Sequence, residues 1–285
     1  GDLIEGCGLV GTFRVSGATF AGVVGRGCLA LTMPPKGGRR AGFVPPDAAG
    51  AGTEDYPHRV MLRTPQFHLI SLTFMVSAGA GLMAIGVMKL YPVELLTDGG
   101  LSEDEASAIA GTAMAVFFSL ANGIGRLVWG TLSDKLGRRR SLVTMTTTQG
   151  VLFLLFTVMA GNEYTLYLAA ALIGFNFGGN FALFPAITAD EFGNRAVADN
   201  YPWVFLSYGV GGIVFPILGG WLGDAGSFGV AFAAAGVMCL IGALAAFLVF
   251  PPHHDEASRP FSVHGFLHNA HLFEREPAGR NRAAV

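Results

Sequence analysis

The chain reads FGVAFAAAGVMCLIGALAAFLVF from Phe228 to Phe250, followed by Pro251 and Pro252. This stretch contains no charged residue, and it exceeds the roughly 20 apolar residues that a helix needs to cross a bilayer. The two prolines end it, because proline cannot continue a helix. The stretch predicts a transmembrane helix and therefore an integral membrane protein.

Similar apolar blocks recur along the chain. Charged residues make up 13% of its 285 residues, whereas a soluble protein usually has about 25%. The first block is interrupted by Arg14 and Arg26, and we count it as a span because a long arginine side chain can extend toward the membrane surface. The predicted fold class is an all-α membrane protein with about seven transmembrane helices. The seven predicted spans are 10–33, 67–88, 107–129, 142–160, 165–189, 202–222 and 228–250.

Two polar segments lie outside these spans. Residues 34–64 are rich in Pro, Gly and Ala and carry several Lys and Arg, which predicts a flexible linker. Residues 253–285 are polar with little periodicity, which predicts a surface tail. Lysine and arginine are enriched in cytoplasmic loops. The linker and the loop after the third span are basic, so the linker and the tail are predicted to face the cytoplasm, at the cell membrane.

The remaining composition argues against several other classes of protein. The net charge of -2 gives no basic surface for nucleic acid. Cys7, Cys28 and Cys239 are far apart, so the sequence shows neither a disulfide framework nor metal-ligand spacing. No nucleic-acid partner, metal or cofactor is expected.

Three short motifs are similar to motifs of enzymes or metal sites, but each lacks the neighbouring residues that such a site requires. The glycines of residues 6–11 match the dinucleotide fingerprint, but too few residues precede them to show a βαβ unit. His253 and His254 are adjacent and lack further ligands. Ser207 lacks the glycine that precedes the serine of a nucleophile elbow. The chain is not expected to be an enzyme.

A basic turn follows the third predicted span and reads GTLSDKLGRRR from Gly130 to Arg140. Gly137 permits a tight turn, Asp134 can pair with a cation or a helix N-terminus, and the arginines suit an anionic membrane surface. An ordinary positive-inside loop explains the basic residues alone but not the whole pattern. The residues that carry the pattern are Gly130, Asp134, Lys135, Gly137, Arg138 and Arg139.

This turn resembles the signature loop of the major facilitator superfamily, and its place between the second and third spans after the linker matches as well. The resemblance implies two six-helix halves around a central cavity, joined by a cytoplasmic linker. Residues 1–33 then correspond to the last helix of an N-terminal half, 34–64 to the linker, 65–252 to a C-terminal six-helix bundle and 253–285 to a cytoplasmic tail. In this interpretation the chain is little more than half a transporter. Its expected partners are membrane lipid and a missing N-terminal half or a second subunit.

Four stretches narrow the resemblance to the oxalate/formate antiporter family. They are Gly11-Thr12-Phe13-Arg14-Val15 with Gly17, Leu31-Thr32-Met33-Pro34-Pro35, Asn122-Gly123-Ile124-Gly125-Arg126 and Asn200-Tyr201. The resemblance implies a small organic anion as substrate.

Arg126 is the leading candidate for a substrate ligand. It lies eight positions before Asp134, about 12 Å along a helix, so its permanent charge should face a cavity or a partner. Its planar guanidinium suits a carboxylate, and the resemblance implies an arginine at this place that holds oxalate. Asn122 lies one turn away on the same face and can orient the guanidinium or touch the substrate. A snorkelling arginine, or one paired within the bundle, is the alternative.

Tyr208 stands where the resembled family has a second substrate cation, a lysine. A phenol can donate a hydrogen bond but is no Coulombic partner for a second carboxylate. This departure favours a monocarboxylate such as formate, or another small organic anion, over oxalate. Aromatic packing is the alternative role for Tyr208.

Asn176 and Asn180 are four residues apart and therefore share a helix face. They are candidates for substrate contacts, and interhelical hydrogen bonding is the alternative. Gly174 and Gly178 have the small-xxx-small spacing of close helix contacts.

These features together predict a secondary active transporter of small organic anions, such as formate- or oxalate-like carboxylates. It would work by alternating access, through antiport or proton coupling. A truncated, non-transporting membrane component that binds a ligand or regulates a partner is the alternative. An incomplete reading frame and a homodimer of two such halves also stay open.

Overall fold

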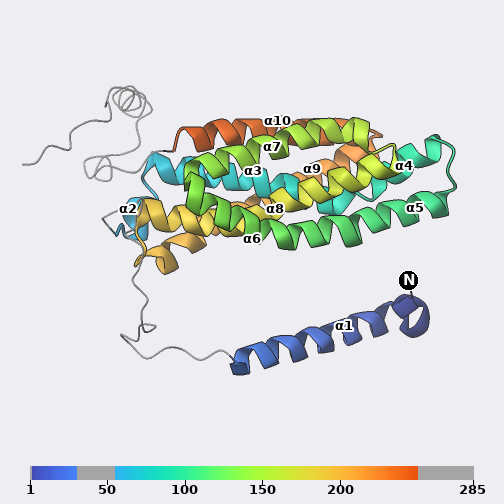
Figure 1. Ribbon diagram of the computed structural model, residues 1–285, viewed down its shortest axis with the longest axis horizontal. Helices are drawn as coiled ribbons and strands as arrows, with labels where there is room; N and C mark the ends of the chain where they lie inside the picture. The colour runs from blue at the N-terminus through green and yellow to red at the C-terminus, as the bar shows by residue number, and fades with distance from the viewer. Residues whose placement is uncertain (1, 31–54, 250–285) are drawn as a thin grey trace, which may run out of the picture. The chain divides into compact units, whose positions relative to one another are not determined.

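The computed structural model describes residues 2–30 and 55–249, and every regular element within these two ranges is a helix. Figure 1 shows these elements, and they confirm the predicted all-α class. The elements are α1 (Asp2–Ala30), α2 (His58–Met61), α3 (Pro65–Val87), α4 (Leu90–Asp98), α5 (Glu103–Thr112), the π-helical turn η1 (Ala113–Phe118), α6 (Ser119–Leu136), α7 (Arg138–Met159), α8 (Glu163–Phe192), α9 (Val197–Asp224) and α10 (Phe228–Phe247).

Six helical stretches are long and apolar enough to cross a membrane, and they coincide with the second to seventh predicted spans. Several of them extend beyond the apolar block, because a helix continues into polar residues that cap it. The longest, Glu103–Leu136, joins α5, η1 and α6. It starts at a capping box in which Ser102 and Glu105 each accept a hydrogen bond from the backbone N–H of the other.

The first predicted span is helical but is not among these six. It forms α1, a separate unit from the bundle, with a non-helical backbone at Gly8 (φ 66°). Arg14, Arg26 and many Gly, Ser and Thr residues lower its mean hydropathy. Six of the seven predicted spans are thus long and apolar enough among the described residues, and the first is helical but less apolar. Residues 31–33 of the first span lie outside the described residues.

The predicted linker and tail lie mostly outside the described residues. The last part of the linker, residues 55–64, is described and packs on the bundle. Met61 in α2 is fully buried, and Tyr56 is 9% exposed. Thr64 accepts a hydrogen bond from the backbone N–H of Phe67 and caps α3. This part of the linker is thus held in place by buried apolar side chains.

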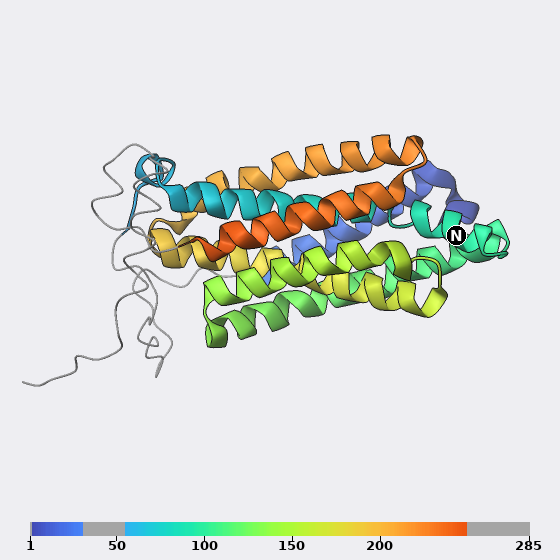
Figure 2. The same ribbon diagram turned by 90° about the horizontal axis from the view of Figure 1, so that it is seen from above.

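The six spanning helices alternate in direction, so the bundle has two ends (Figures 1 and 2). The α2 end carries α2, the α6–α7 turn and the α8–α9 turn. The α4 end carries α4 and α5. Within the bundle, α3 packs chiefly against α9 and α10, and α8 packs chiefly against α6 and α7.

Glycine permits two close helix contacts in this arrangement. A Cβ atom on Gly178 would overlap the backbone carbonyl of Asn122, which shows how closely α8 approaches α6. A Cβ atom on Gly211 would overlap the backbone carbonyl of Met75, where α9 meets α3. Gly174 makes the same kind of approach to η1. The predicted role of Gly174 and Gly178 in close helix packing is confirmed.

Candidate functional site

Arg126 lies in the middle of α6, eight residues before Asp134 near the α2 end. At 1.5 Å per residue this is about 12 Å along the helix. No other charged residue of the described bundle lies so far from the end of a spanning helix. A guanidinium at this depth is costly unless water, a partner or a ligand solvates it.

The side chain of Arg126 contacts one residue of its own helix and one residue of α8. Its Nε donates a hydrogen bond to Oδ1 of Asn122, 3.4 Å away and one turn further from the α2 end. Its guanidinium lies over the ring of Phe181 on α8, 4.4 Å from the ring centroid. This cation–π contact partly replaces the lost hydration. The geometry disfavours a snorkelling arginine, since snorkelling would direct the side chain toward the α2 end.

Phe181 also brings Tyr208 to this site. The ring centroids of Phe181 and Tyr208 are 5.7 Å apart, and Tyr208 stacks on Phe205 at 5.0 Å. Tyr208 is half-buried on α9, so three helices meet at the cluster. Phe181 could not be identified from the sequence, because one phenylalanine among 23 has no distinguishing spacing.

Hydrogen-bond donors at this site are unused. Among the described residues, the phenol of Tyr208 has no hydrogen-bond partner, and Arg126 uses only Nε. The terminal guanidinium nitrogens and the phenol therefore offer donors beside one aromatic ring. This donor set matches an anion with acceptor oxygens, such as a carboxylate.

Asn176 and Asn180 lie elsewhere, in hydrogen bonds between helices. Asn176 is 4% exposed, donates to Thr148 on α7 at 3.1 Å and accepts from Trp129 on α6 at 3.2 Å. Asn180 is fully buried and accepts from Ser77 on α3 at 2.8 Å. These contacts engage both amides and favour the interhelical alternative over contact with substrate.

The signature loop forms a tight turn between α6 and α7. Gly137 has φ 89° and ψ 148°, a backbone conformation that side chains disfavour. Lys135 is exposed in the last turn of α6, where a cation interacts favourably with the helix dipole. Gly130 lies one turn before Asp134, and its carbonyl accepts a hydrogen bond from Ser133 at 2.8 Å.

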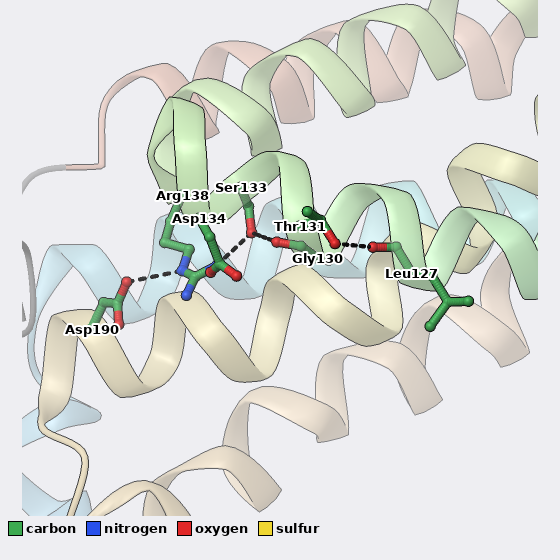
Figure 3. Close-up of polar contacts among 7 residues, drawn as sticks. All are labelled: Leu127, Gly130, Thr131, Ser133, Asp134, Arg138 and Asp190. Atoms are coloured by element: carbon green, nitrogen blue, oxygen red, sulfur yellow. Dashed lines mark hydrogen bonds and ion pairs between the residues drawn. The ribbon is translucent and has the colours of Figure 1, made fainter. Parts of the chain in front are cut away.

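Arg138 is the centre of the loop's charged contacts, which Figure 3 shows. Its guanidinium pairs with Asp134 at 2.6 Å and with Asp190, near the end of α8, at 3.0 Å. It also donates to the hydroxyl of Ser133. The loop is thereby joined to the α2 end of α8. The sequence pattern gave no indication of Asp190 as a partner.

Arg139 joins the same loop to α10. It donates to the backbone carbonyl of Phe247, and its guanidinium lies 4.7 Å from the centroid of the Phe247 ring. The carbonyl belongs to the last turn of α10, where helices leave carbonyl groups unpaired. Arg138 and Arg139 thus tie the α6–α7 turn to two further helices.

Comparison with known proteins places these features in a family. Residues 59–280 match the family described as Major Facilitator Superfamily. The chain belongs to this superfamily. Membership indicates a multi-pass membrane transporter rather than an enzyme.

Two relatives within the superfamily cover most of this chain. YhjX of Escherichia coli (strain K12), an uncharacterized MFS-type transporter, is 30% identical over 74% of this chain and 49% of YhjX. An oxalate:formate antiporter of Oxalobacter formigenes is 28% identical over 69% of this chain and 45% of the antiporter. The chain thus spans about half the length of these relatives and resembles the oxalate/formate antiporter family, as predicted. Apicoplast pyruvate carrier 1 of Toxoplasma gondii is 34% identical over 41% of this chain and 21% of the carrier.

Proposed function

We propose that this chain is part of a secondary active transporter of small organic anions that works by alternating access, through antiport or proton coupling. The observation that carries the proposal is the exposed Arg126 guanidinium midway along α6, which has unused donors. It contacts Phe181, as does Tyr208, whose phenol has no hydrogen-bond partner among the described residues. The similarity to an oxalate:formate antiporter supports a carboxylate as the anion. We place the transporter in the cell membrane, with the linker and the tail on the cytoplasmic side.

The donor geometry supports one carboxylate per site. A guanidinium binds a carboxylate through two parallel hydrogen bonds, and the phenol of Tyr208 can add a third. The rings of Phe181 and Phe205 surround the donors with apolar surface that accommodates a short apolar substituent. The described bundle has no second cation at this depth, so the site as it stands favours a monocarboxylate such as formate.

Transport requires that the anion bind two states of the protein differently. In alternating access, two halves of a transporter move about a site near the midplane of the bilayer. The bundle described here supplies one side of such a site. We propose that a second half, from an N-terminal segment or another subunit, encloses the other side.

Uptake of radiolabelled formate and oxalate into proteoliposomes tests the proposal. Arg126→Ala should reduce uptake at least 10-fold, because it removes the charge-assisted hydrogen bonds, each worth about 1.5–3 kcal/mol. Arg63→Ala is the matched control, since Arg63 is exposed between α2 and α3 at the end of the bundle, and it should leave uptake unchanged. Equal uptake by Arg126→Ala and the unmodified chain would remove Arg126 from the mechanism. Binding of either anion without uptake would instead support the alternative, a non-transporting binding component.

A further inference from the structure

The segment before α3 holds the start of α9 through its backbone. The backbone N–H of Tyr56 donates to the carbonyl of Phe192, the last residue of α8, at 3.0 Å. The carbonyl of Tyr56 accepts from Nδ2 of Asn200, in the first turn of α9, at 2.8 Å. One residue of the linker thus bonds to both sides of the α8–α9 turn.

Three further contacts support the same attachment. The backbone N–H of Arg195, within the α8–α9 turn, donates to the carboxylate of Asp55 at 3.0 Å. The rings of His58 and Trp203 are stacked with centroids 6.1 Å apart. Met61 is fully buried in the same apolar cluster as Phe192 and Val204. We call residues 55–61 the clamp.

Asn200 supplies the buried polar side chain of this attachment. It is fully buried, and its Oδ1 has no hydrogen-bond partner among the described residues. A buried amide with one unpaired oxygen is unfavourable, so the bond from Nδ2 to Tyr56 matters for keeping it there. In the sequence, Asn200 is marked only by the family resemblance of Asn200-Tyr201, which implies no role for it in this attachment.

The middle of α9 is fixed at a second point, where Gly211 lies against the backbone of α3. Between the two points, α9 contains Pro202, whose missing N–H removes one bond of the helix. Asn200 lies about 16 Å from Gly211 along the axis, and Tyr208 lies about 4.5 Å from it. A tilt of α9 about Gly211 would therefore move its first turn several times further than Tyr208.

We propose that the clamp is a latch on the α2 end of α9, that Asn200 is its positioning residue, and that its release opens this end of the bundle. The link to transport rests on the proposed function. Breaking one buried hydrogen bond costs about 1 kcal/mol or more, which is about a 5-fold change in an equilibrium constant. The linker would thus set how readily α9 moves, while Arg126 and Tyr208 set the affinity for the anion.

Hydrogen–deuterium exchange of the full chain in lipid nanodiscs tests the latch without reference to transport. In Asn200→Ala, amide exchange in residues 55–61 and 197–203 should rise at least 5-fold, and exchange in residues 213–224 and in α10 should stay unchanged. Asp55→Ala removes a different hydrogen bond, the one from the backbone N–H of Arg195 to the exposed Asp55. It should raise exchange in the same segments. Asn162→Ala is the matched control, because Asn162 caps α8 at the opposite end and should affect only the start of α8.

Uptake kinetics then test the role in transport. Asn200→Ala should lower the maximal uptake rate more than 3-fold. Release of α9 favours the state in which the α2 end of the bundle is open, and this slows the return to the other state of the transport cycle. The KM should change less than 2-fold, since Tyr208 lies close to the fixed point at Gly211.

Unchanged exchange in residues 197–203 in both variants would overturn the latch, and so would a uniform rise in exchange across the whole bundle. Raised local exchange with an unchanged maximal rate would overturn its role as a gate. If the unmodified chain takes up no anion when its second half is present, the proposed function fails, and the exchange pattern alone decides the latch.

Discussion

Replacing Tyr208 with lysine should change which anion the site prefers. Arg126 and Tyr208 contact the same Phe181 ring, 4.4 Å and 5.7 Å from its centroid. A lysine at position 208 would place a second cation beside the first. Two opposite charges about 4 Å apart attract by about 4 kcal/mol at an effective dielectric constant of 20. Desolvation of the ammonium opposes this attraction, so we expect the net gain of a charge-assisted hydrogen bond, about 1.5–3 kcal/mol.

That gain applies to a dianion and not to a monocarboxylate. The ratio of the oxalate Kd to the formate Kd should therefore fall roughly 10-fold or more in Tyr208→Lys, measured by competition for binding to the purified chain. Tyr208→Phe removes only the hydroxyl and should weaken both anions to a similar degree. Leu206→Lys is the control for added charge, because Leu206 is 59% exposed on the same helix, and it should leave the ratio unchanged. An unchanged ratio in Tyr208→Lys would refute the placement of the second carboxylate beside Tyr208.

Two further substitutions test the packing around this site. Gly178→Ala should lower the Tm of the detergent-solubilised chain by several degrees or prevent folding, because the added Cβ overlaps the backbone carbonyl of Asn122; an unchanged Tm would contradict the close helix contact. Asn180→Ala should destabilise the bundle by about 1–3 kcal/mol, because it leaves the hydroxyl of Ser77 with one hydrogen bond fewer, and it should leave formate affinity unchanged. A large loss of affinity at unchanged stability would instead return Asn180 to the substrate site.

The apolar blocks predicted the bundle well, because each span must satisfy its own backbone hydrogen bonds in lipid. The π-helical turn η1 before α6 was not predicted. There the hydroxyl of Ser119 donates to the carbonyl of Met114, five residues back. The one extra residue of the π-helical turn does not change the hydropathy of the segment, so hydropathy cannot predict the turn. The first predicted span is helical over its described residues, but Arg14 and Arg26 lower its mean hydropathy, so the other six spans are the clearer ones.

The candidate site was predicted only in part. An arginine inside a predicted span can be identified from sequence, because a charged side chain within the hydrocarbon region of a bilayer has a large free-energy cost. Asn176 and Asn180 share a face by spacing, but spacing does not say whether that face meets another helix or a cavity. The structure shows polar partners for both amides on neighbouring helices. Phe181 and the clamp depend on contacts between distant parts of the chain, which no local pattern encodes.

The two residues of the proposed anion site lie on differently packed helices. Arg126 is on α6, which meets α8 by backbone contact at Gly178, whereas Tyr208 is on α9, which meets α3 by backbone contact at Gly211. Close backbone contacts of this kind leave the two helices of a pair little freedom to slide past each other at the point of contact. The two pairs are joined by side chains, among them the contact between Phe181 and Tyr208 and the hydrogen bond from Ser77 to Asn180. An anion bound by both Arg126 and Tyr208 would strengthen that junction, and binding energy could then be coupled to the movement of α9 against α6.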